Sequence, residues 1–436
     1  PCTMIRLYDF DEVKPEEILN RDIRAEADVE ATVDAIIADV RARGDAALLD
    51  YAAKFDHAQL DSVQVTQAEI DEAFAALEAS DPEFITTLKM AAANIRHFHE
   101  QQLHKNFVLN DRPGMVLGQK YTPIQRAGVY VPGGTAAYPS TVLMDVIPAK
   151  VAGVQQIVMT TPAGRDGKVN AGILAAAVIA GIDCIFKTGG AQAVAALAYG
   201  TESVPAVDKI VGPGNIYVAT AKRKVFGKVG IDMIAGPSEI LVLADGTCNP
   251  AWVAADLLSQ AEHDKLATPV LVTDSWDLAK AVQAELEVQI PQLPRAAIAR
   301  ASVDTNGKII VTDDMKKAID AVNIIAPEHW EICVDDPFAV LNDIQNAGSI
   351  FLGKNVPEAL GDYFAGPNHT LPTSGTARFS SPLGVDDFVK KSSFIYYTRE
   401  ALGEVQARIA NFAEHEGLHA HAKSVTIRFE DEQKGE

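Results

Sequence analysis

The sequence predicts an α/β protein with two doubly wound (Rossmann-like) parallel sheets, and three observations support this prediction. From residue 128 onward, short β-branched runs alternate with alanine-rich helical stretches, as in successive βαβ units. The alternation occurs in two successive series of similar length. The chain has 436 residues, 48% of them apolar, which is enough to bury more than one core.

The residues before the first series are expected to be helical. Apolar side chains recur there at every third or fourth position among Ala, Glu and Lys, which is the period of an amphipathic helix. The expected helices span residues 29–42, 45–55, 67–79 and 81–102.

The first series predicts strands that are each followed by a helix. The strands are expected at 128–131, 157–161 and 184–187, and the helices at 140–154, 171–182 and 191–199. The second series predicts a further sheet. Its strands are expected at 240–244, 270–273, 309–311, 330–334 and 350–352, with helices such as 251–263 and 276–288 between them.

The pattern changes after residue 353. Residues 362–387 are rich in Gly and Pro, and a loop of that length in a compact chain is usually functional. A helix around 400–414, a His-rich stretch and a short β-like run at 425–429 are expected to close the chain.

Composition argues against nucleic-acid and membrane partners. The 59 acidic and 38 basic residues give a formal charge of −21, which repels a phosphate backbone, and no basic run is long enough to offset it. The longest uncharged apolar run, 171–182, has 12 residues, whereas a membrane span needs about 20. The first dozen residues show no secretory signal, and the four scattered cysteines indicate a reducing cytoplasm.

Three glycine-rich turns follow expected strands of the first series, at 129–134, 189–192 and 212–215. Glycines at such turns let backbone amides approach a phosphate at a helix N-terminus. None of the turns reads Gly-x-Gly-x-x-Gly, so each by itself is weak evidence for a dinucleotide and is better explained as an ordinary tight turn. Their occurrence in one sheet favours a nucleotide crevice.

Two further patterns suggest a metal site and an acid/base pair. Gln260 and His263 are one helical turn apart, so an amide oxygen and an imidazole can face the same ion. The alternative is a solvated last turn of a helix. Glu328 and His329 are adjacent before an expected strand, and such groups can serve two different proton transfers. The alternative is a pair whose side chains point apart.

The stretch from His415 to His421 contains His-Glu-x-x-His, the helical pattern of zinc peptidases. Gly417 weakens the helix between the two histidines, and 15 residues follow His421, which leaves little room for a downstream ligand. A non-proteolytic metal or substrate site is therefore favoured over a peptidase, and a solvated histidine run is the remaining alternative.

Taken together, these motifs show that the chain resembles the histidinol dehydrogenase family. The resemblance extends from the helical lead-in to about residue 429. The stretches that carry it are 128–134, 211–215, 232–239, 256–264, 327–329, 366–373 and 416–421.

The resemblance implies a zinc-dependent enzyme that oxidises L-histidinol to L-histidine in two steps, each reducing one NAD. It also implies a homodimer with shared active sites. The implied organisation has a small N-terminal helical segment, a larger α/β domain with the metal and acid/base residues, a second α/β domain on the NAD side, and a C-terminal helical segment. Their expected bounds are 1–25, 26–129 with 237–384, 130–236, and 385–436.

The resemblance also implies roles for individual residues. The four implied ligands of one zinc ion per subunit are Gln260, His263, Asp362 and His421. Positions associated with NAD are Tyr130, Gln192 and Asn215. Ser238, His369 and Glu416 line the substrate pocket, which the zinc ligands and His329 also touch, while Glu328 and His329 form the acid/base pair. His419 is expected to be a bystander.

Two alternatives to this function stay open from the sequence. The first is a dehydrogenase of the same fold that acts on another small primary alcohol. The second, of a different class, is the zinc peptidase. A non-catalytic zinc-binding protein would leave Glu328 and His329 without a role.

Overall fold

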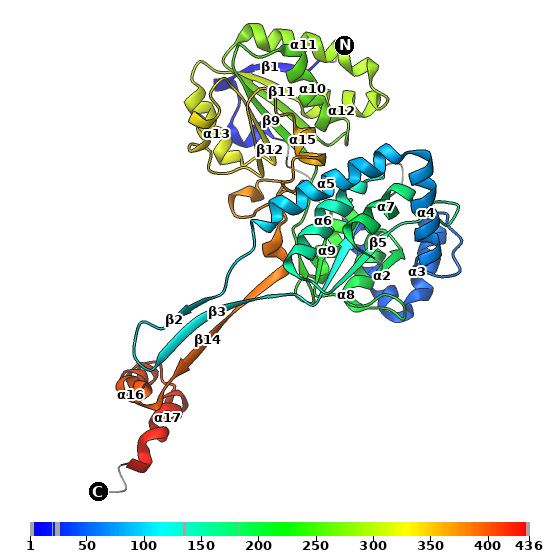
Figure 1. Ribbon diagram of the computed structural model, residues 1–436. Helices are drawn as coiled ribbons and strands as arrows, with labels where there is room; N and C mark the ends of the chain where they lie inside the picture. The colour runs from blue at the N-terminus through cyan, green and yellow to red at the C-terminus, as the bar shows by residue number, and fades with distance from the viewer. Residues whose placement is uncertain (1–3, 20, 22–26, 134–136, 183, 433–436) are drawn as a thin grey trace. The chain divides into compact units, whose positions relative to one another are not determined.

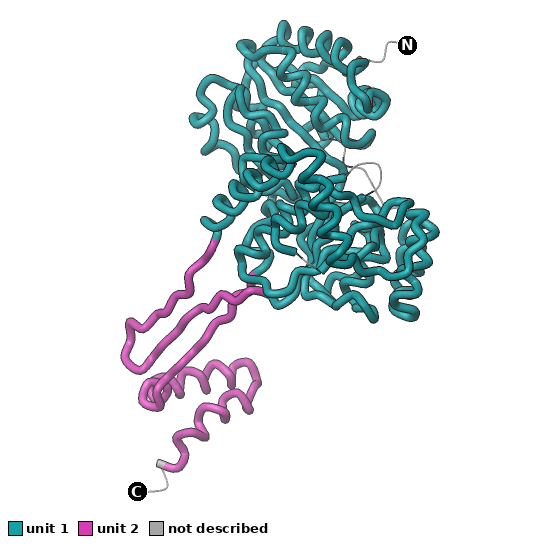
Figure 2. The backbone as a smooth tube through the Cα atoms, turned by 45° about the vertical axis from the view of Figure 1, so that its right-hand side comes forward, with its two compact units in different colours: residues 1–102, 124–388 teal, residues 103–123, 389–436 magenta. Residues whose placement is uncertain are grey.

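The structure is a computed structural model that describes residues 4–19, 21, 27–133, 137–182 and 184–432. It divides into two compact units (Figure 2): unit 1 comprises Pro1–Gln102 and Ile124–Phe388, and unit 2 comprises Leu103–Pro123 and Val389–Glu436. Gly134 of the first glycine-rich turn and part of the expected segment 1–25 lie outside the described residues.

The first sheet of unit 1 has five parallel strands in the order β6-β5-β4-β7-β8. They are β4 (Arg126–Tyr130), β5 (Gln156–Thr161), β6 (Cys184–Lys187), β7 (Lys209–Val211) and β8 (Gly230–Ile231). The chain winds outward from the central strand β4 to β6 and then continues on the other side, so the order reverses between β4 and β7. Open α/β sheets bind ligands at such a switch point, beyond the carboxyl ends of the strands.

Helices cover both faces of this sheet (Figure 1). Those that share one buried apolar cluster are α4 (Gln67–Ser80), α5 (Pro82–Glu100), α6 (Pro139–Ala152) and α7 (Ala171–Ala180). Those on the opposite cluster are α2 (Ala27–Arg43), α3 (Asp45–Phe55), α8 (Gly190–Tyr199) and α9 (Ile216–Val225).

The packing of α2 to α5 differs from the expected division of the chain, which grouped residues 26–129 with 237–384. In the structure, α4 packs on α7, α5 packs on α6, and α2 packs on α8 and α9. Strand β4, which straddles the expected boundary at residue 130, is the centre of the five-stranded sheet. The apolar face of an amphipathic helix can pack on either sheet, so periodicity alone does not choose between them.

The second sheet of unit 1 has six parallel strands in the order β1-β11-β10-β9-β12-β13. They are β1 (Arg6–Asp9), β9 (Glu239–Ala244), β10 (Thr268–Thr273), β11 (Lys308–Val311), β12 (His329–Cys333) and β13 (Ser349–Leu352). Strands β9 and β10 are buried along their whole length, as expected for parallel strands covered on both faces. The prediction of two doubly wound parallel sheets is confirmed, although β1 and β8 were not among the predicted strands and the strand expected before residue 212, β7, was given no bounds.

Helices also cover both faces of this second sheet. One buried layer contains α10 (Pro250–Ala261), α11 (Trp276–Gln289) and α12 (Ala296–Asn306). The other contains α1 (Pro15–Ile18) and α13 (Met315–Ile325). Two short helices, α14 (Phe338–Leu341) and α15 (Glu358–Tyr363), follow β12 and β13.

Unit 2 is built on an antiparallel sheet that the sequence did not reveal. Its strands are β2 (Phe107–Leu109), β3 (Met115–Pro123) and β14 (Val389–Tyr397), and β3 is paired with the other two. Two helices follow, α16 (Arg399–His415) and α17 (His419–Thr426). The expected helix at 400–414 is therefore present, whereas the C-terminal segment is not purely helical.

The expected β-like run at 425–429 is wrong. Its first residues end α17, and Ile427–Glu432 form a 3-10 helix. A β-branched run becomes a strand only where a neighbouring strand pairs with it, and among the described residues no strand pairs with residues 425–429.

Among the residues that the structure describes, no helix is both long and apolar enough to cross a membrane. Cys248 and Cys333 are buried and form no disulfide among the described residues.

Candidate functional site

The three residues expected to bind a dinucleotide all lie at the carboxyl ends of strands in the five-stranded sheet. Tyr130 ends β4, Gln192 is in the first turn of α8 after β6, and Asn215 precedes α9 after β7. Tyr130 and Gln192 are buried, and the Tyr130 hydroxyl accepts a hydrogen bond from the backbone N–H of Gly190 at 3.1 Å. The Asn215 side-chain oxygen caps α9 by accepting from the backbone N–H groups of residues 217 and 218.

The turn at Gly212 is held rigidly at the switch point. Gly212 has φ +123°, and a Cβ atom there would lie 2.1 Å from the carbonyl oxygen of Tyr130, so only glycine fits. Its N–H donates to Asp232 Oδ2 at 2.9 Å, and its carbonyl accepts from Lys222 Nζ at 3.0 Å. Lys222 and Asp232 also form a buried ion pair. The ends of β4 and β7 are thereby fixed next to each other.

The expected acid/base pair lies at the start of β12, beside the first residue of β9. Glu328 and His329 are both buried. Glu328 Oε2 accepts from the backbone N–H of Glu239 at 2.8 Å, and His329 Nδ1 lies 2.8 Å from the Glu239 carbonyl oxygen. Because a carbonyl oxygen can only accept, Nδ1 carries the proton and directs Nε2 away from β9.

Helix α15 supplies two carboxyl groups to the same place. One oxygen of Glu358 lies 3.2 Å from His329 Nε2, and ligand atoms of His329, Glu358 and Asp362 all lie within 4.8 Å of one another. Neither His329 Nε2 nor Glu358 Oε1 makes a well-aligned hydrogen bond among the described residues, and the buried side-chain oxygen of Gln260 also lacks a partner. Buried polar atoms are rarely left unpaired, so this cluster is shaped for a further polar group.

The charges of the cluster are strongly coupled. Burial raises the pKa of Glu328 to about 7. Burial also acts to lower the pKa of His329, but the carboxylates of Glu328 and Glu358 outweigh it and raise that pKa well above its ordinary value. Burial and the hydrogen bond with Glu358 raise the pKa of Asp362 to about 9, while His329 and Asp362 hold the pKa of Glu358 below its ordinary value.

The residues of unit 1 expected to hold zinc carry donor atoms that suit such an ion, although the close cluster around Asp362 is formed with His329 and Glu358 and does not include His263. A carboxyl group that stays protonated because of a neighbouring carboxylate, as Asp362 does, is one that a divalent cation ionises. Gln260 lies near the end of α10, and its unpaired oxygen is a suitable donor. His263 follows α10, and its side chain is exposed. The donor set of oxygen and imidazole nitrogen suits zinc or another divalent cation.

The other residues of unit 1 that are expected in the substrate pocket lie next to this cluster. Ser238 precedes Glu239 and is half-buried. His369 Nδ1 is hydrogen bonded to the Asp362 carbonyl oxygen at 3.0 Å, and burial lowers the pKa of its ring to about 4. The segment 362–387 therefore contributes to the cluster, as its length suggested.

Glu416 and His421 belong to unit 2 and are exposed there. Helix α16 ends at His415, Gly417 adopts φ +71°, and α17 begins at His419. The His-Glu-x-x-His pattern requires both histidines on one continuous helix. The structure therefore contradicts the peptidase alternative.

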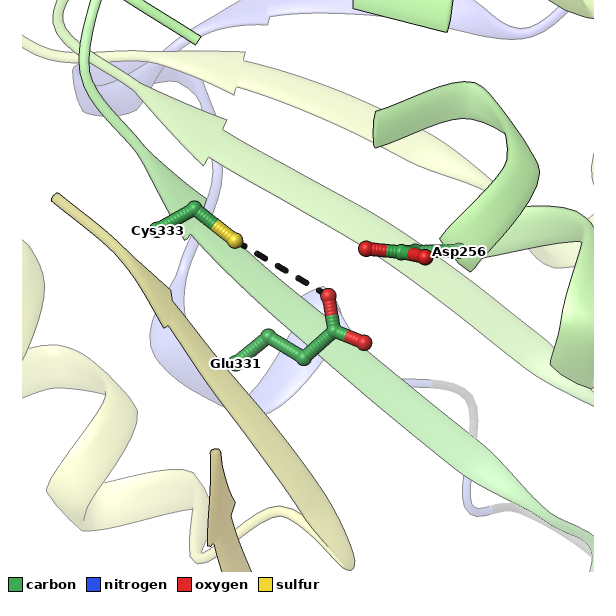
Figure 3. Close-up of side chains that lie close together, drawn as sticks. All are labelled: Asp256, Glu331 and Cys333. Carbon is green, nitrogen blue, oxygen red and sulfur yellow. Dashed lines mark hydrogen bonds between the residues drawn. The ribbon is translucent and has the colours of Figure 1, made fainter. Parts of the chain in front are cut away.

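Sequence reasoning missed Glu358 and its support. Glu358 stands four residues before Asp362, a helical spacing that could have indicated it. Its backbone N–H donates to Glu331 Oε1 at 3.0 Å. Glu331 on β12 lies close to Cys333 of the same strand and to Asp256 of helix α10 (Figure 3). Burial and the hydrogen bond between the carboxyl groups of Glu331 and Asp256 raise the pKa of Glu331. This buried cluster holds the start of α15 in place.

Glycine-rich turns at the switch point of one Rossmann-like sheet, and a buried Glu-His cluster at the start of β12 in the second, are the arrangement expected of an α/β enzyme of the dehydrogenase class. The family model described as histidinol dehydrogenase matches residues 19–429. The chain belongs to the histidinol dehydrogenase family.

Individual relatives agree with this assignment. The chain is 53% identical over 425 residues to a protein named histidinol dehydrogenase from Listeria monocytogenes, covering 97% of each chain. It is 58% identical over 368 residues to the protein of that name from Bacillus subtilis, covering 84% of this chain and 86% of the relative. The crystal structure of histidinol dehydrogenase from Elizabethkingia anophelis superposes with a TM-score of 0.93 at 38% identity, covering 99% of each chain.

Proposed function

We propose that this enzyme oxidises L-histidinol to L-histidine through the aldehyde, with two molecules of NAD and one zinc ion per subunit, in the last steps of histidine biosynthesis. The observation that carries the proposal is the buried cluster of Glu328, His329, Glu358 and Asp362, in which ligand atoms of the last three lie within 4.8 Å of one another, in a chain of this family.

His329 is the proposed base for the alcohol step. Its Nδ1–H is held by the Glu239 carbonyl, which leaves the lone pair of Nε2 to accept the hydroxyl proton as the alcohol is oxidised. The carboxylates of Glu328 and Glu358 raise the pKa of His329. A cationic substrate or a divalent ion beside them offsets their charge, and so favours the neutral, proton-accepting ring.

Glu328 is the proposed base for the second step, in which the aldehyde takes up water before it is oxidised to the acid. Because burial raises the pKa of Glu328 to about 7, its carboxylate is a stronger base than an exposed one and is still partly ionised near neutral pH. It can therefore take a proton from the attacking water.

Gln260, His263 and Asp362 would hold the zinc ion together with His421. When bound, zinc supplies a fixed positive charge that orients the nitrogen atoms of the substrate, with Lewis acidity secondary. Tyr130, Gln192 and Asn215 would hold NAD, which supplies the hydride acceptor. Their position beyond β4, β6 and β7 supports this role.

Ser238, His369 and Glu416 would complete the substrate pocket, and Glu416 and His421 are proposed to reach it from the second subunit of a homodimer. Unit 2 supports a dimer because large apolar side chains are exposed on it, as expected of a surface covered by another chain. They include Phe107, Val108, Ile395 and Phe412. The cytoplasm, suggested by the scattered cysteines, stays a prediction.

The direct test is an assay of the purified protein with zinc, NAD and L-histidinol. We expect NADH absorbance to rise until two NADH have formed per histidinol, and we expect turnover to stop when zinc is chelated. A panel of other primary alcohols serves as the control, since only an imidazole-bearing alcohol should be preferred. Absence of NADH formation with histidinol would overturn the proposal.

A further inference from the structure

Glu239 is the residue on which the acid/base pair is built. It is 2% exposed and begins β9. Its backbone N–H donates to the Glu328 carboxylate, and its carbonyl accepts from His329 Nδ1. Its own carboxylate accepts from the backbone N–H of Glu328 at 3.3 Å. A small shift of Glu239 therefore moves both members of the pair.

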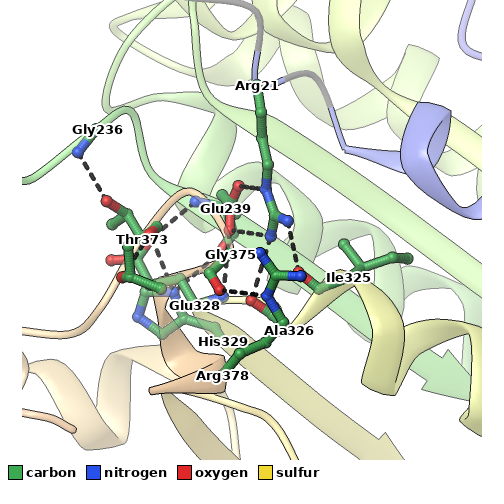
Figure 4. Close-up of polar contacts among 11 residues, drawn as sticks. Arg21, Gly236, Glu239, Ile325, Ala326, Glu328, His329, Thr373, Gly375 and Arg378 are labelled. Atoms are coloured by element: carbon green, nitrogen blue, oxygen red, sulfur yellow. Dashed lines mark hydrogen bonds and ion pairs between the residues drawn. The ribbon is translucent and has the colours of Figure 1, made fainter. Parts of the chain in front are cut away.

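The carboxylate of Glu239 is in turn held by Arg21, from the segment that precedes α2 (Figure 4). Arg21 Nε donates to Oε2 at 2.9 Å and Nη2 donates to Oε1 at 3.1 Å, which is the bidentate geometry in which arginine pairs most strongly with a carboxylate. Without this cation, Glu239 would be a buried charge next to Glu328, an unfavourable arrangement for both carboxyl groups.

The same guanidinium also binds the end of α13. Nη1 donates to the carbonyl of Ile325 at 2.5 Å and Nη2 to that of Ala326 at 3.2 Å. Ala326 has φ +54°, a conformation that costs energy in a residue other than glycine and persists only when its surroundings enforce it. The chain then passes through Pro327 directly to Glu328. Arg21 thus fixes both the start of β9, which contacts the pair, and the turn at Ala326, which leads into Glu328.

We propose that Arg21 is a positioning residue for Glu328 and His329, acting through Glu239. This inference rests on the proposed function of that pair as proton carriers. Among the described residues, Arg21 makes its hydrogen bonds to Glu239, Ile325 and Ala326 and none to the side chains of the pair. Its effect is therefore expected on the chemical steps rather than on the binding of NAD or zinc.

The test compares Arg21→Gln and Arg21→Lys with a matched control in the full-length, zinc-loaded enzyme. Arg300 of α12 forms a similar bidentate pair with Glu287 of α11, since each terminal nitrogen of Arg300 donates to one carboxylate oxygen at 2.8 Å. Both helices pack on the six-stranded sheet. Arg300→Gln therefore removes a comparable ion pair at a distance from the cluster. For each variant, kcat, KM for histidinol, KM for NAD, zinc content and melting temperature are measured.

We expect R21Q to lower kcat by about 100-fold, the cost of a misplacement of about 1 Å, with zinc content and KM for NAD unchanged. R21K should lose about tenfold, because a lysine keeps the charge but not the fork. R300Q should stay within about twofold of wild type. If R21Q lowers the melting temperature as R300Q does but leaves kcat unchanged, the role is structural and the inference is wrong.

Glu239→Gln shows whether Arg21 acts through Glu239. The glutamine oxygen can still accept from the Glu328 N–H, and no buried charge is left when Arg21 is removed. In the E239Q background, R21Q should therefore lower kcat by less than about threefold relative to E239Q alone. A full loss in that background would overturn the route through Glu239. If R21Q does not fold, R21K in both backgrounds gives the same comparison.

A second readout separates this inference from the proposed function. The imidazole Nδ1–H of His329 should give a downfield proton resonance, identified by its loss in His329→Ala. We expect the signal to shift or vanish in R21Q and to persist in R300Q. An unchanged signal in R21Q would contradict positioning even if no alcohol were oxidised, whereas failure of the wild type to form NADH concerns the proposed function alone.

Discussion

The carboxyl group of Asp145 on α6 is fully buried, where it contacts Thr370 of segment 362–387. One oxygen accepts from Thr370 Oγ1 at 2.8 Å, and the other has no partner among the described residues. Burial raises the pKa of Asp145 to about 8, against an ordinary value of 3.8. From about pH 4 to pH 8 the folded protein therefore retains a proton that the unfolded chain releases.

This difference predicts how stability depends on pH. Because the folded state binds more protons in that window, the free energy of unfolding should fall as pH rises, by up to about 1.4 kcal/mol per unit from this group. Asp145→Asn should remove that part of the slope. Melting temperatures at pH 5 and pH 8 check this, with exposed Asp277→Asn as control. Equal slopes for wild type and D145N would contradict the prediction.

Residue identity alone was enough to predict some members of the site but not others. Glu328 and His329 are adjacent in the chain at the start of an expected strand, so the sequence could suggest them as a pair, while their contacts with Glu239 came only from the structure. Glu239 lies 89 residues from Glu328, and Arg21 lies 218 residues from Glu239 and 304 from Ile325. No local pattern connects residues at such separations, and the structure alone brings them together.

At the scale of elements, α9 combines a helix cap with a predicted cofactor contact. The Asn215 oxygen caps the helix, while its amide nitrogen makes no hydrogen bond among the described residues. Asn215→Asp keeps the cap, because aspartate and asparagine are equally good at this position, but replaces the amide donor with a negative charge.

We therefore expect N215D to keep the melting temperature while KM for NAD rises by about tenfold, since one lost hydrogen bond to a charged ligand costs about 1.5 kcal/mol or more. Asn249 caps α10, which packs on the six-stranded sheet. Asn249→Asp should change neither the melting temperature nor KM for NAD. Steady-state kinetics and thermal melts check both. An unchanged KM in N215D would remove Asn215 from the cofactor site.

The strands and helices of unit 1 were largely predictable because their local periodicity and their burial agree. β9 is a run of apolar residues buried on both faces, and α10 follows after a clear Asn249 cap. The strands β3 and β14 were missed because they alternate weakly and lie mostly half-buried or exposed. Without a buried face, a strand has little signature in its sequence.

At the scale of the whole molecule, the proposed homodimer can be tested by mixing two defects. Inactive His329→Ala lies in unit 1 and inactive His421→Ala lies in unit 2. If each site takes His421 from the other subunit, a mixed dimer has one site with both defects and one intact site. Random pairing then restores about a quarter of wild-type activity.

The measurement uses co-expression of the two variants with different tags and assays the purified mixture. Glu328→Gln with His329→Ala is the matched control, because both changes lie in unit 1 and no mixed dimer regains a complete site. Recovery in neither pair would mean that His421 serves its own chain or no site at all.

The sequence by itself determined the two doubly wound sheets, the adjacency of Glu328 and His329, and membership in a family through motifs spread over the chain. These features are local, since each depends on spacing within a few turns or strands. Only the tertiary structure decided that α2 to α5 cover the five-stranded sheet, that Glu358 joins Asp362 beside His329, and that Arg21 supports them through Glu239. Those relations depend on packing and charge pairing between distant segments, which short-range periodicity does not encode.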